Sequence, residues 1–325
     1  MTVANRLPTI YALISAVIVA LCLTGGSAAA QAKGGQQVEH QIDVPGALPF
    51  AMYRPETVKA GAPAPLVFLL HGSSGEGTSI LNRSNLKAMA NKYGFIIAAP
   101  TGAIRLAQGF AWNIPGVVTA GGAAPGAGDR DDVKYLLSIL DLLAEQGLVD
   151  RSRVYVTGFS GGGRMASWLG CVASTRFAAI APVVGLRAGA PLASDPRQPD
   201  PDSCRPESPI PVLTFAGDSD TTNPIAGGGA KYWQYSMHAA EMRWAGLNRC
   251  ERRPLTRRVS ARVYQEVYDG CQDGAMVTAY ITEGGGHTWL ADEEVMWKFF
   301  TRYARAADGK LLTGDSPDAA PASRQ

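Results

Sequence analysis

From Pro65 onward, short apolar runs rich in β-branched residues alternate with segments of helical period, and this alternation constrains the fold more than any other feature. The pattern is typical of an α/β fold with a mostly parallel central sheet and helices on both faces. The clearest helix is predicted after Asp129, where apolar residues recur at intervals of three and four. The predicted strands are Leu66–Leu70, Phe95–Ala99, Val154–Thr157, Ala178–Val184, Val212–Ala216 and Met276–Ile281.

The chain is long enough for one large core, since it has 325 residues, of which 46% are apolar. We expect a single catalytic domain over residues 31–307. Two irregular stretches, 106–128 and 186–210, fall between predicted strands, and we expect them to overhang the carboxyl edge of the sheet, where open α/β sheets bind ligands. The polar residues 308–325 are expected to form a disordered tail.

The charge balance argues against a nucleic-acid partner. Lysine and arginine together number 30 and the acidic residues 28, which gives a formal charge of +2. The sequence contains no block of basic residues that would follow a phosphate backbone. The sequence pattern does not predict whether the protein is a monomer or an oligomer.

Residues 1–30 have the order of a secretory signal peptide. Arg6 is their only charged side chain, an apolar run follows from Ile10 to Leu23, and Ala28 to Ala30 supply small residues for cleavage. The alternative is a permanent membrane anchor, but the apolar run is shorter than the roughly 20 residues that a spanning helix needs. We therefore expect cleavage after Ala30 and a secreted or periplasmic protein.

Four cysteines remain once Cys22 leaves with the signal peptide. In an oxidising compartment an even number predicts two disulfides, and proximity in sequence favours Cys171 with Cys204 and Cys250 with Cys271 among the possible pairings. Zinc binding is the competing interpretation. It is disfavoured because no C-x-x-C pair is present and no histidine lies near a cysteine at ligand spacing, so we expect no metal or cofactor.

Ser160 is the candidate nucleophile. Residues 158–162 match G-x-S-x-G, follow the apolar run at 154–156 and precede a segment of helical character. A sharp turn from strand to helix requires small neighbours around the serine and offers helix N-terminal amides to an oxyanion. The pentapeptide alone is a weak signal in a glycine-rich chain, so its position between a strand and a helix carries the inference.

A serine nucleophile needs a base and an acid, which follow it along the chain in this architecture. Of the two histidines after Ser160, His238 lies in a helix-like segment, whereas His287 follows three glycines after a predicted strand. His287 is therefore the predicted base. Asp218 and Asp220 both follow another predicted strand, and spacing alone does not choose between them.

The oxyanion hole needs two backbone donors. Gly161, which directly follows the nucleophile, supplies one. The loop after Leu66–Leu70 supplies the second, with Ser73 preferred and Ser74 as the alternative, and His71 is expected to support this loop.

Five sequence motifs, some of which contain these candidate residues, resemble those of a known protein family. They are Leu70-His71-Gly72, Asp131-Asp132-Val133, residues 153–160, residues 177–183 and Gly285-Gly286-His287-Thr288-Trp289. In them the chain resembles the polyhydroxybutyrate depolymerase and feruloyl esterase-like group of secreted α/β-hydrolases, over approximately residues 45–305. The acid motif of that group, His-Gly-Thr-x-Asp followed by proline, aligns with residues 216–224 and selects Asp220.

The chain departs from the group at three positions. Ala216 replaces the usual histidine of the acid motif, Asp218 replaces its threonine, and Leu290 replaces the proline after His-x-Trp. None of these changes removes a candidate catalytic residue, so activity is still expected. The edge that faces the substrate is expected to differ, and the names of particular substrates transfer poorly.

The resemblance implies a secreted serine carboxylic ester hydrolase that works through an acyl-enzyme on feruloyl, hydroxyalkanoate or similar short esters. Trp112 and Trp289 lie in predicted loops and are candidates for contact with a small or oligomeric ester. Two alternatives stay open. The same triad could serve a serine peptidase, or the fold could serve a polymer- or glycan-binding protein without catalysis.

Overall fold

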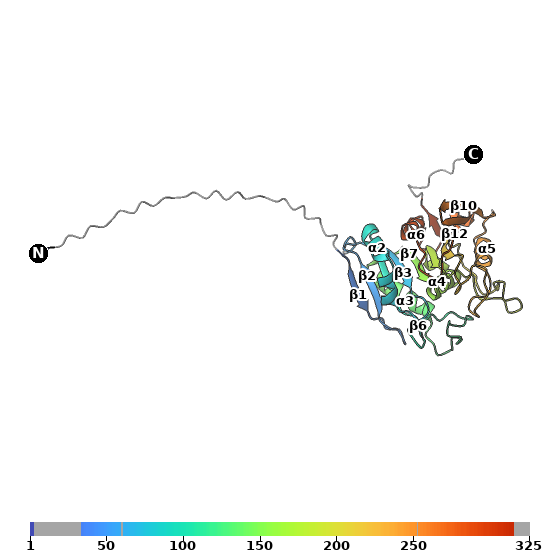
Figure 1. The fold of residues 1–325 in the computed structure, drawn as a ribbon, viewed down its shortest axis with the longest axis horizontal. Coiled ribbons are helices and arrows are strands. Elements are labelled where there is room, and N and C mark those ends of the chain that lie inside the picture. Colours follow the sequence, from blue (N-terminus) through green and yellow to red (C-terminus); the bar gives the residue numbers. More distant parts are fainter. Residues whose placement is uncertain (3–33, 60, 252, 315–325) are drawn as a thin grey trace, which may run out of the picture. The chain divides into compact units, whose positions relative to one another are not determined.

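The computed structural model describes residues 1–2, 34–59, 61–251 and 253–314, which the ribbon in Figure 1 follows from blue to red. The predicted signal peptide lies almost wholly outside the described residues. The strands are β1 (Gln36–His40), β2 (Phe50–Arg54), β3 (Ala64–Leu70), β4 (Ile96–Ala99), β5 (Ile104–Arg105), β6 (Phe110–Ala111), β7 (Val149–Phe159), β8 (Ala179–Val183), β9 (Val212–Gly217), β10 (Leu255–Ser260), β11 (Val263–Tyr268), β12 (Val277–Thr282), β13 (Tyr303–Arg305) and β14 (Leu311–Thr313). The helices are α1 (Gly77–Arg83), α2 (Leu86–Tyr93), α3 (Asp132–Glu145), α4 (Gly161–Val172), α5 (Met237–Leu247) and α6 (Glu293–Phe300), with 3-10 turns η1 (Ser174–Arg176) and η2 (Gln272–Gly274).

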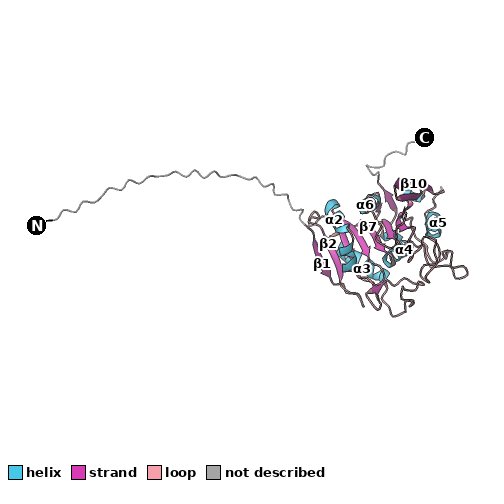
Figure 2. Cartoon of the chain, in the orientation of Figure 1, coloured by secondary structure: helices cyan, strands magenta, loops and turns pink. Residues whose placement is uncertain are grey.

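A ten-stranded sheet runs through the described chain in the order β1-β2-β4-β3-β7-β8-β9-β12-β11-β10. Its six central strands are parallel, and β1, β2, β10 and β11 add antiparallel margins. Figure 1 shows β1 at the left and β10 at the upper right of the folded part, and Figure 2 shows the magenta strands with cyan helices around them. The expected α/β fold, with a mostly parallel central sheet, is confirmed.

The two faces of the sheet build two apolar cores. Along β3, Leu66, Phe68 and Leu70 pack with α3, α4 and α5, while Val67 and Leu69 pack with α1, α2 and α6. All seven residues of β3 are buried, which explains the continuous apolar run in its sequence. Because both faces are covered by helices, the carboxyl ends of the parallel strands and the loops beyond them are left to form a site.

Helix α3 begins where its sequence predicts. The Asp131 side chain accepts a hydrogen bond from the Lys134 N–H and caps the helix, while Asp132 lies in its first turn. Leu136, Leu140 and Leu143 are buried along one side of α3. The helical period thus matches the buried face.

All six predicted strands are present, with bounds shifted by a few residues. The outermost antiparallel strands, β1 and β10, were not predicted, because their residues are largely exposed and do not form apolar runs. The predicted tail begins too early. Leu311 is buried and β14 pairs with β13, so the chain stays ordered to at least Thr313, and residues 315–325 lie outside the described part.

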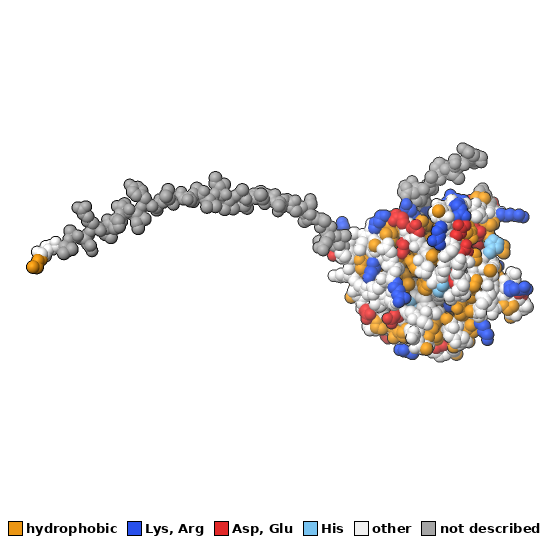
Figure 3. Space-filling view, in the orientation of Figure 1, with side chains coloured by type: hydrophobic (Ala, Val, Ile, Leu, Met, Phe, Trp, Pro, Cys, Tyr) orange, Lys and Arg blue, Asp and Glu red, His pale blue; other side chains and the backbone are white. Residues whose placement is uncertain are grey.

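Two disulfides join Cys171 to Cys204 and Cys250 to Cys271, the pairing that proximity in sequence favours. Among the described residues, no helix has both the length and the apolar character that a bilayer span requires. On the face drawn in Figure 3, basic and acidic side chains of the described residues are interspersed. That mixture gives no support to a nucleic-acid interface on this face.

Candidate active site

Ser160 lies at the turn between β7 and α4, in a backbone conformation that non-glycine residues rarely adopt. Its φ is 51° and its ψ is −108°. The turn needs glycine on both sides, since a Cβ at position 162 would lie 2.2 Å from the Leu70 carbonyl oxygen and one at position 158 would lie 2.5 Å from the Gly162 backbone. The residue types of G-x-S-x-G therefore follow from this close approach.

A chain of hydrogen bonds joins three side chains that are far apart in sequence. Nε2 of His287 lies 2.9 Å from the Ser160 Oγ, and Nδ1 of His287 lies 2.8 Å from an Asp220 carboxylate oxygen. With the proton on Nδ1, Nε2 is free to accept from the serine hydroxyl. The other Asp220 oxygen accepts from the N–H groups of Thr222 and Asn223, both at 2.8 Å, which fixes the carboxylate in place.

Asp218 has a different place. Its carboxylate accepts from the Gly284 N–H at 2.7 Å and from the Ser219 hydroxyl, and the residue is exposed. It therefore braces the loop that carries His287, whereas Asp220 contacts His287 itself.

Two backbone N–H groups, those of Ser73 and Gly161, belong to segments that lie close together beside Ser160. A Cβ at Gly161 would lie 2.9 Å from the Ser73 nitrogen, so the N–H groups of Ser73 and Gly161 belong to neighbouring backbone segments. The Ser74 N–H is already engaged, because it donates to the Phe110 carbonyl at 2.9 Å. In the described chain the Ser73 N–H has no such acceptor, so it rather than Ser74 is available to an oxyanion.

Buried contacts of His71 and Trp112 support the loop that carries Ser73. His71 is 1% exposed, and its Nε2 accepts from the Gly102 N–H at 3.0 Å. Burial lowers the pKa of His71 to about 4, so the ring is neutral at ordinary pH and can accept this bond. The Trp112 indole donates to the His71 carbonyl at 2.8 Å, and the two rings lie 4.8 Å apart.

The two tryptophans named from the sequence occupy different surroundings. Trp112 is buried, yet it lines a small pocket together with Ser73 and Gly161. Trp289 is half-buried, and its indole N–H donates to Glu293 on α6 at 2.8 Å. The position of Trp112 therefore suits a substrate contact better than that of Trp289.

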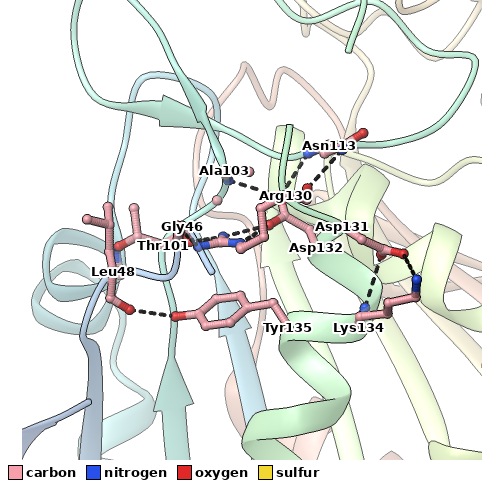
Figure 4. Close-up of polar contacts among 12 residues, drawn as sticks. Gly46, Leu48, Thr101, Ala103, Asn113, Arg130, Asp131, Asp132, Lys134 and Tyr135 are labelled. Carbon is pink, nitrogen blue, oxygen red and sulfur yellow. Dashed lines mark hydrogen bonds and ion pairs between the residues drawn. The ribbon is translucent and has the colours of Figure 1, made fainter. Parts of the chain in front are cut away.

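A buried ion pair fixes the loop that carries Trp112 (Figure 4). The Arg130 guanidinium lies 2.6 Å from one oxygen of the Asp132 carboxylate, and both side chains are almost fully buried. The other oxygen accepts from the backbone N–H groups of Ala103 and Asn113. Asp132, in the first turn of α3, thus ties the loop before and after Trp112 to a rigid helix.

Two residues that the sequence did not single out stand beside this site. Arg164 in α4 and Arg187 after β8 are both buried and line one pocket. The sequence did contain a sign that Arg164 is unusual. It lies in the first turn of a helix, where a positive charge is unfavourable because it opposes the helix dipole. Arg187 lies in an irregular stretch that gave no comparable signal.

One group of side chains could offer ligands to a metal ion. His238, Glu241 and Glu266 each present one donor atom, and these atoms lie within 4.8 Å of one another. The group lies on α5 and β11, and none of its members lines the pockets beside Ser160.

The sheet, the strained serine turn and the ordered Ser160, Asp220 and His287 define an α/β-hydrolase. Residues 48–194 match the family model described as “Esterase PHB depolymerase”. “Putative esterase NocK” of Nocardia uniformis subsp. tsuyamanensis is 31% identical over 279 residues, which are 79% of this chain and 75% of that protein. The chain belongs to the Esterase PHB depolymerase family, a family of carboxylic ester hydrolases.

Two further similarities extend this comparison. “Feruloyl esterase B” of Piromyces equi is 28% identical over 74% of this chain, which spans only 42% of that longer protein. The solved structure “Acetyl xylan esterase from Aspergillus awamori” has a TM-score of 0.57 and 18% identity, and the match covers 83% of this chain and 99% of that one. At this identity the structural similarity bears on the fold.

Proposed function

We propose that the protein is a secreted serine carboxylic ester hydrolase that works through an acyl-enzyme. The observation that carries the proposal is the hydrogen-bond chain from Ser160 through His287 to Asp220. A hydroxyl is a poor nucleophile at neutral pH, and such a chain supplies the base that activates it. The ester-hydrolysing family supports the reaction type.

Each group has a role in the proposed reaction. The Ser160 Oγ attacks the ester carbonyl while Nε2 of His287 takes the hydroxyl proton, and the carbonyl oxygen becomes an oxyanion. The N–H groups of Ser73 and Gly161 donate to this oxyanion. The His287 imidazolium, paired with Asp220, then protonates the departing alcohol, and water releases the acid from Ser160 by the reverse sequence.

The proposed substrates are short feruloyl or hydroxyalkanoate esters, or related esters of similar size. Relatives named feruloyl esterase B and poly(3-hydroxybutyrate) depolymerase support this range. Trp112 beside Ser73 and Gly161 supplies an apolar wall for an acyl group. A panel of feruloyl, hydroxybutyryl and acetyl esters under matched conditions would rank these classes.

Export is part of the proposal. The order of charged, apolar and small residues in 1–30 supports a signal peptide, and the two disulfides suit an oxidising compartment. Sequencing the N-terminus of the protein recovered outside the cytoplasm would test cleavage after Ala30.

The central test replaces Ser160 with alanine and measures the hydrolysis of a short-chain aryl ester. We expect kcat to fall by about 10⁶-fold and labelling by a fluorophosphonate probe to disappear. The matched control is Ser260→Ala at an exposed position on β10, which should keep both turnover and labelling. Retained turnover in Ser160→Ala would refute the proposal.

A further inference from the structure

Arg164 and Arg187 are buried cations with free hydrogen-bond donors. Their exposed fractions are 5% and 7%. Nε and Nη1 of Arg164, and Nε and Nη2 of Arg187, have no hydrogen-bond partner among the described residues. A buried donor without a partner costs free energy, and a buried charge costs more. The arrangement is therefore incomplete without an acceptor.

No acid of the described chain neutralises either guanidinium, since none of the ion pairs there includes them. Aromatic rings, the Tyr235 carbonyl and the Ser73 hydroxyl contact them instead. Arg187 lies 3.1 Å from the centre of the Trp233 ring and donates to the Tyr235 carbonyl at 2.7 Å. Arg164 lies 4.4 Å from the centre of the Tyr232 ring. These contacts orient the guanidinium groups and leave their charge uncompensated.

Burial also lowers the pKa of Arg164 to about 10 and that of Arg187 to about 9. Both groups therefore stay protonated at neutral pH. An anion bound between the two guanidinium groups would raise both pKa values again, because a nearby negative charge favours the protonated form.

The two arginines share one pocket, here named the arginine pocket and lined by Ile114, Val117, Arg164, Trp168, Arg187 and Tyr232. Arg164, Ile114 and Val117 also line the smaller pocket that contains Ser73 and Gly161. Nη2 of Arg164 lies 3.3 Å from the Ser73 Oγ. The arginine pocket therefore adjoins the pocket that contains the proposed oxyanion donors, so a ligand in it would lie close to the position proposed for the ester carbonyl.

We infer that the arginine pocket binds a free carboxylate of the ester substrate, so that the preferred substrates are anionic esters. This inference rests on the proposed ester hydrolysis. Guanidinium groups present several N–H donors in a fixed plane and bind carboxylates in a paired geometry. The apolar side chains of Ile114, Val117 and Trp168 accommodate the carbon spacer between the carboxylate and the reacting ester.

The carboxylate could belong to the acyl part or to the alcohol part of the ester, and two pairs of substrates separate these cases. For the acyl part, monomethyl adipate is compared with methyl adipamate, its neutral amide analogue. For the alcohol part, 4-acetoxybutanoate is compared with 4-acetoxybutanamide. Released methanol or acetate gives kcat/KM for each compound.

We expect one carboxylate to exceed its amide analogue by about 10- to 100-fold in kcat/KM, mainly through KM. The pair that shows this ratio identifies the part of the ester that the pocket holds. Arg187→Gln should bring the ratio close to one. Arg197→Gln, an exposed arginine paired with Asp195, is the charge-matched control and should keep the wild-type ratio.

Wild-type ratios near one in both pairs would overturn the inference, and so would a high ratio that Arg187→Gln leaves unchanged. The wild-type comparison does not depend on whether a variant folds. A calorimetric titration of Ser160→Ala with adipate monoamide tests binding without turnover. Measurable binding that Arg187→Gln abolishes would uphold the pocket even if no ester were hydrolysed, whereas a lack of binding together with normal ester turnover would refute the pocket alone.

Discussion

An oxygen of the Asp220 carboxylate lies 2.8 Å from Nδ1 of His287, although 67 positions separate the two residues in the chain. The other carboxylate oxygen accepts hydrogen bonds from two backbone N–H groups. The Asp220 side chain is 1% exposed and that of His287 is 19% exposed. A fixed, buried acceptor of this kind keeps the imidazole proton on Nδ1 and leaves Nε2 facing Ser160.

Asp220→Asn should therefore lower kcat by about 10⁴-fold. The asparagine amide can donate to Nδ1, which favours the tautomer with the proton on Nε2, and that tautomer cannot take the Ser160 proton. Asp218→Asn is the control, because its amide oxygen can still accept from the Gly284 N–H. Steady-state hydrolysis of an aryl ester measures both variants. A larger loss in Asp218→Asn than in Asp220→Asn would reverse the assignment.

The sequence predicted the centre of the sheet well and its margins poorly, for a physical reason. All of β3 and the second half of β7 are buried, so their residues there form largely apolar runs. Every residue of β10 is exposed, and β1 is similar. Their pairing comes from neighbouring strands rather than from a local pattern, so no local pattern could predict it.

The candidate site likewise divides into residues that local sequence patterns predict and residues that only the fold brings together. Ser160 and His287 were predicted because each follows a strand in a glycine-rich turn. Asp218 and Asp220 have the same chemistry two positions apart, and only the resemblance to a family separated them. Arg187 lies in an irregular stretch and meets Arg164 only because the fold brings both to one pocket. Proximity of that kind depends on loop conformation, which residue patterns do not encode.

The ion pair between Arg130 and Asp132 predicts a loss of stability when one partner is removed. Asp132→Asn would leave the buried Arg130 guanidinium without its counter-charge, so the free energy of unfolding should fall by about 3 kcal/mol. KM for an aryl ester should also rise, because the single amide oxygen of asparagine cannot accept both from Arg130 and from the Asn113 N–H beside Trp112. Urea unfolding and steady-state kinetics measure the two effects.

The neighbouring position supplies a control for that prediction. Asp131 caps α3 and its side chain is half exposed, and asparagine is an equally good capping residue. Asp131→Asn should therefore change the free energy of unfolding by less than about 0.5 kcal/mol. Equal destabilisation by the two variants would show that the buried charge pair is not the cause.

The disulfide between Cys171 and Cys204 predicts a stability difference that depends on loop length. It joins α4, the helix after Ser160, to the segment that carries Arg187, and it spans 33 positions. Cys171→Ala with Cys204→Ala should lower the free energy of unfolding by about 4 kcal/mol, and the pair at Cys250 and Cys271, which spans 21 positions, by about 3 kcal/mol. A reductant should lower the free energy of unfolding of the wild type. It should not change that of a variant in which all four cysteines are replaced by alanine.

Glu241 predicts a pH dependence of stability. This glutamate on α5 is 1% exposed, and burial raises its pKa to about 7, while His238 at 3.5 Å lowers it and the nearby Glu266 raises it further. A carboxyl with a raised folded pKa binds more protons in the folded state than in the unfolded state. Stability should therefore fall as the pH rises from about 4.5 through about 7.

Glu241→Gln tests this by imitating the protonated carboxyl at every pH. Near pH 5 the variant and the wild type should have similar free energies of unfolding, and at pH 8.5 the variant should be more stable by up to about 3 kcal/mol. Glu145→Gln, at an exposed position in the last turn of α3, should show no such trend. Chemical unfolding at several pH values provides the measurement, and a difference between Glu241→Gln and wild type that does not grow with pH would contradict the raised pKa.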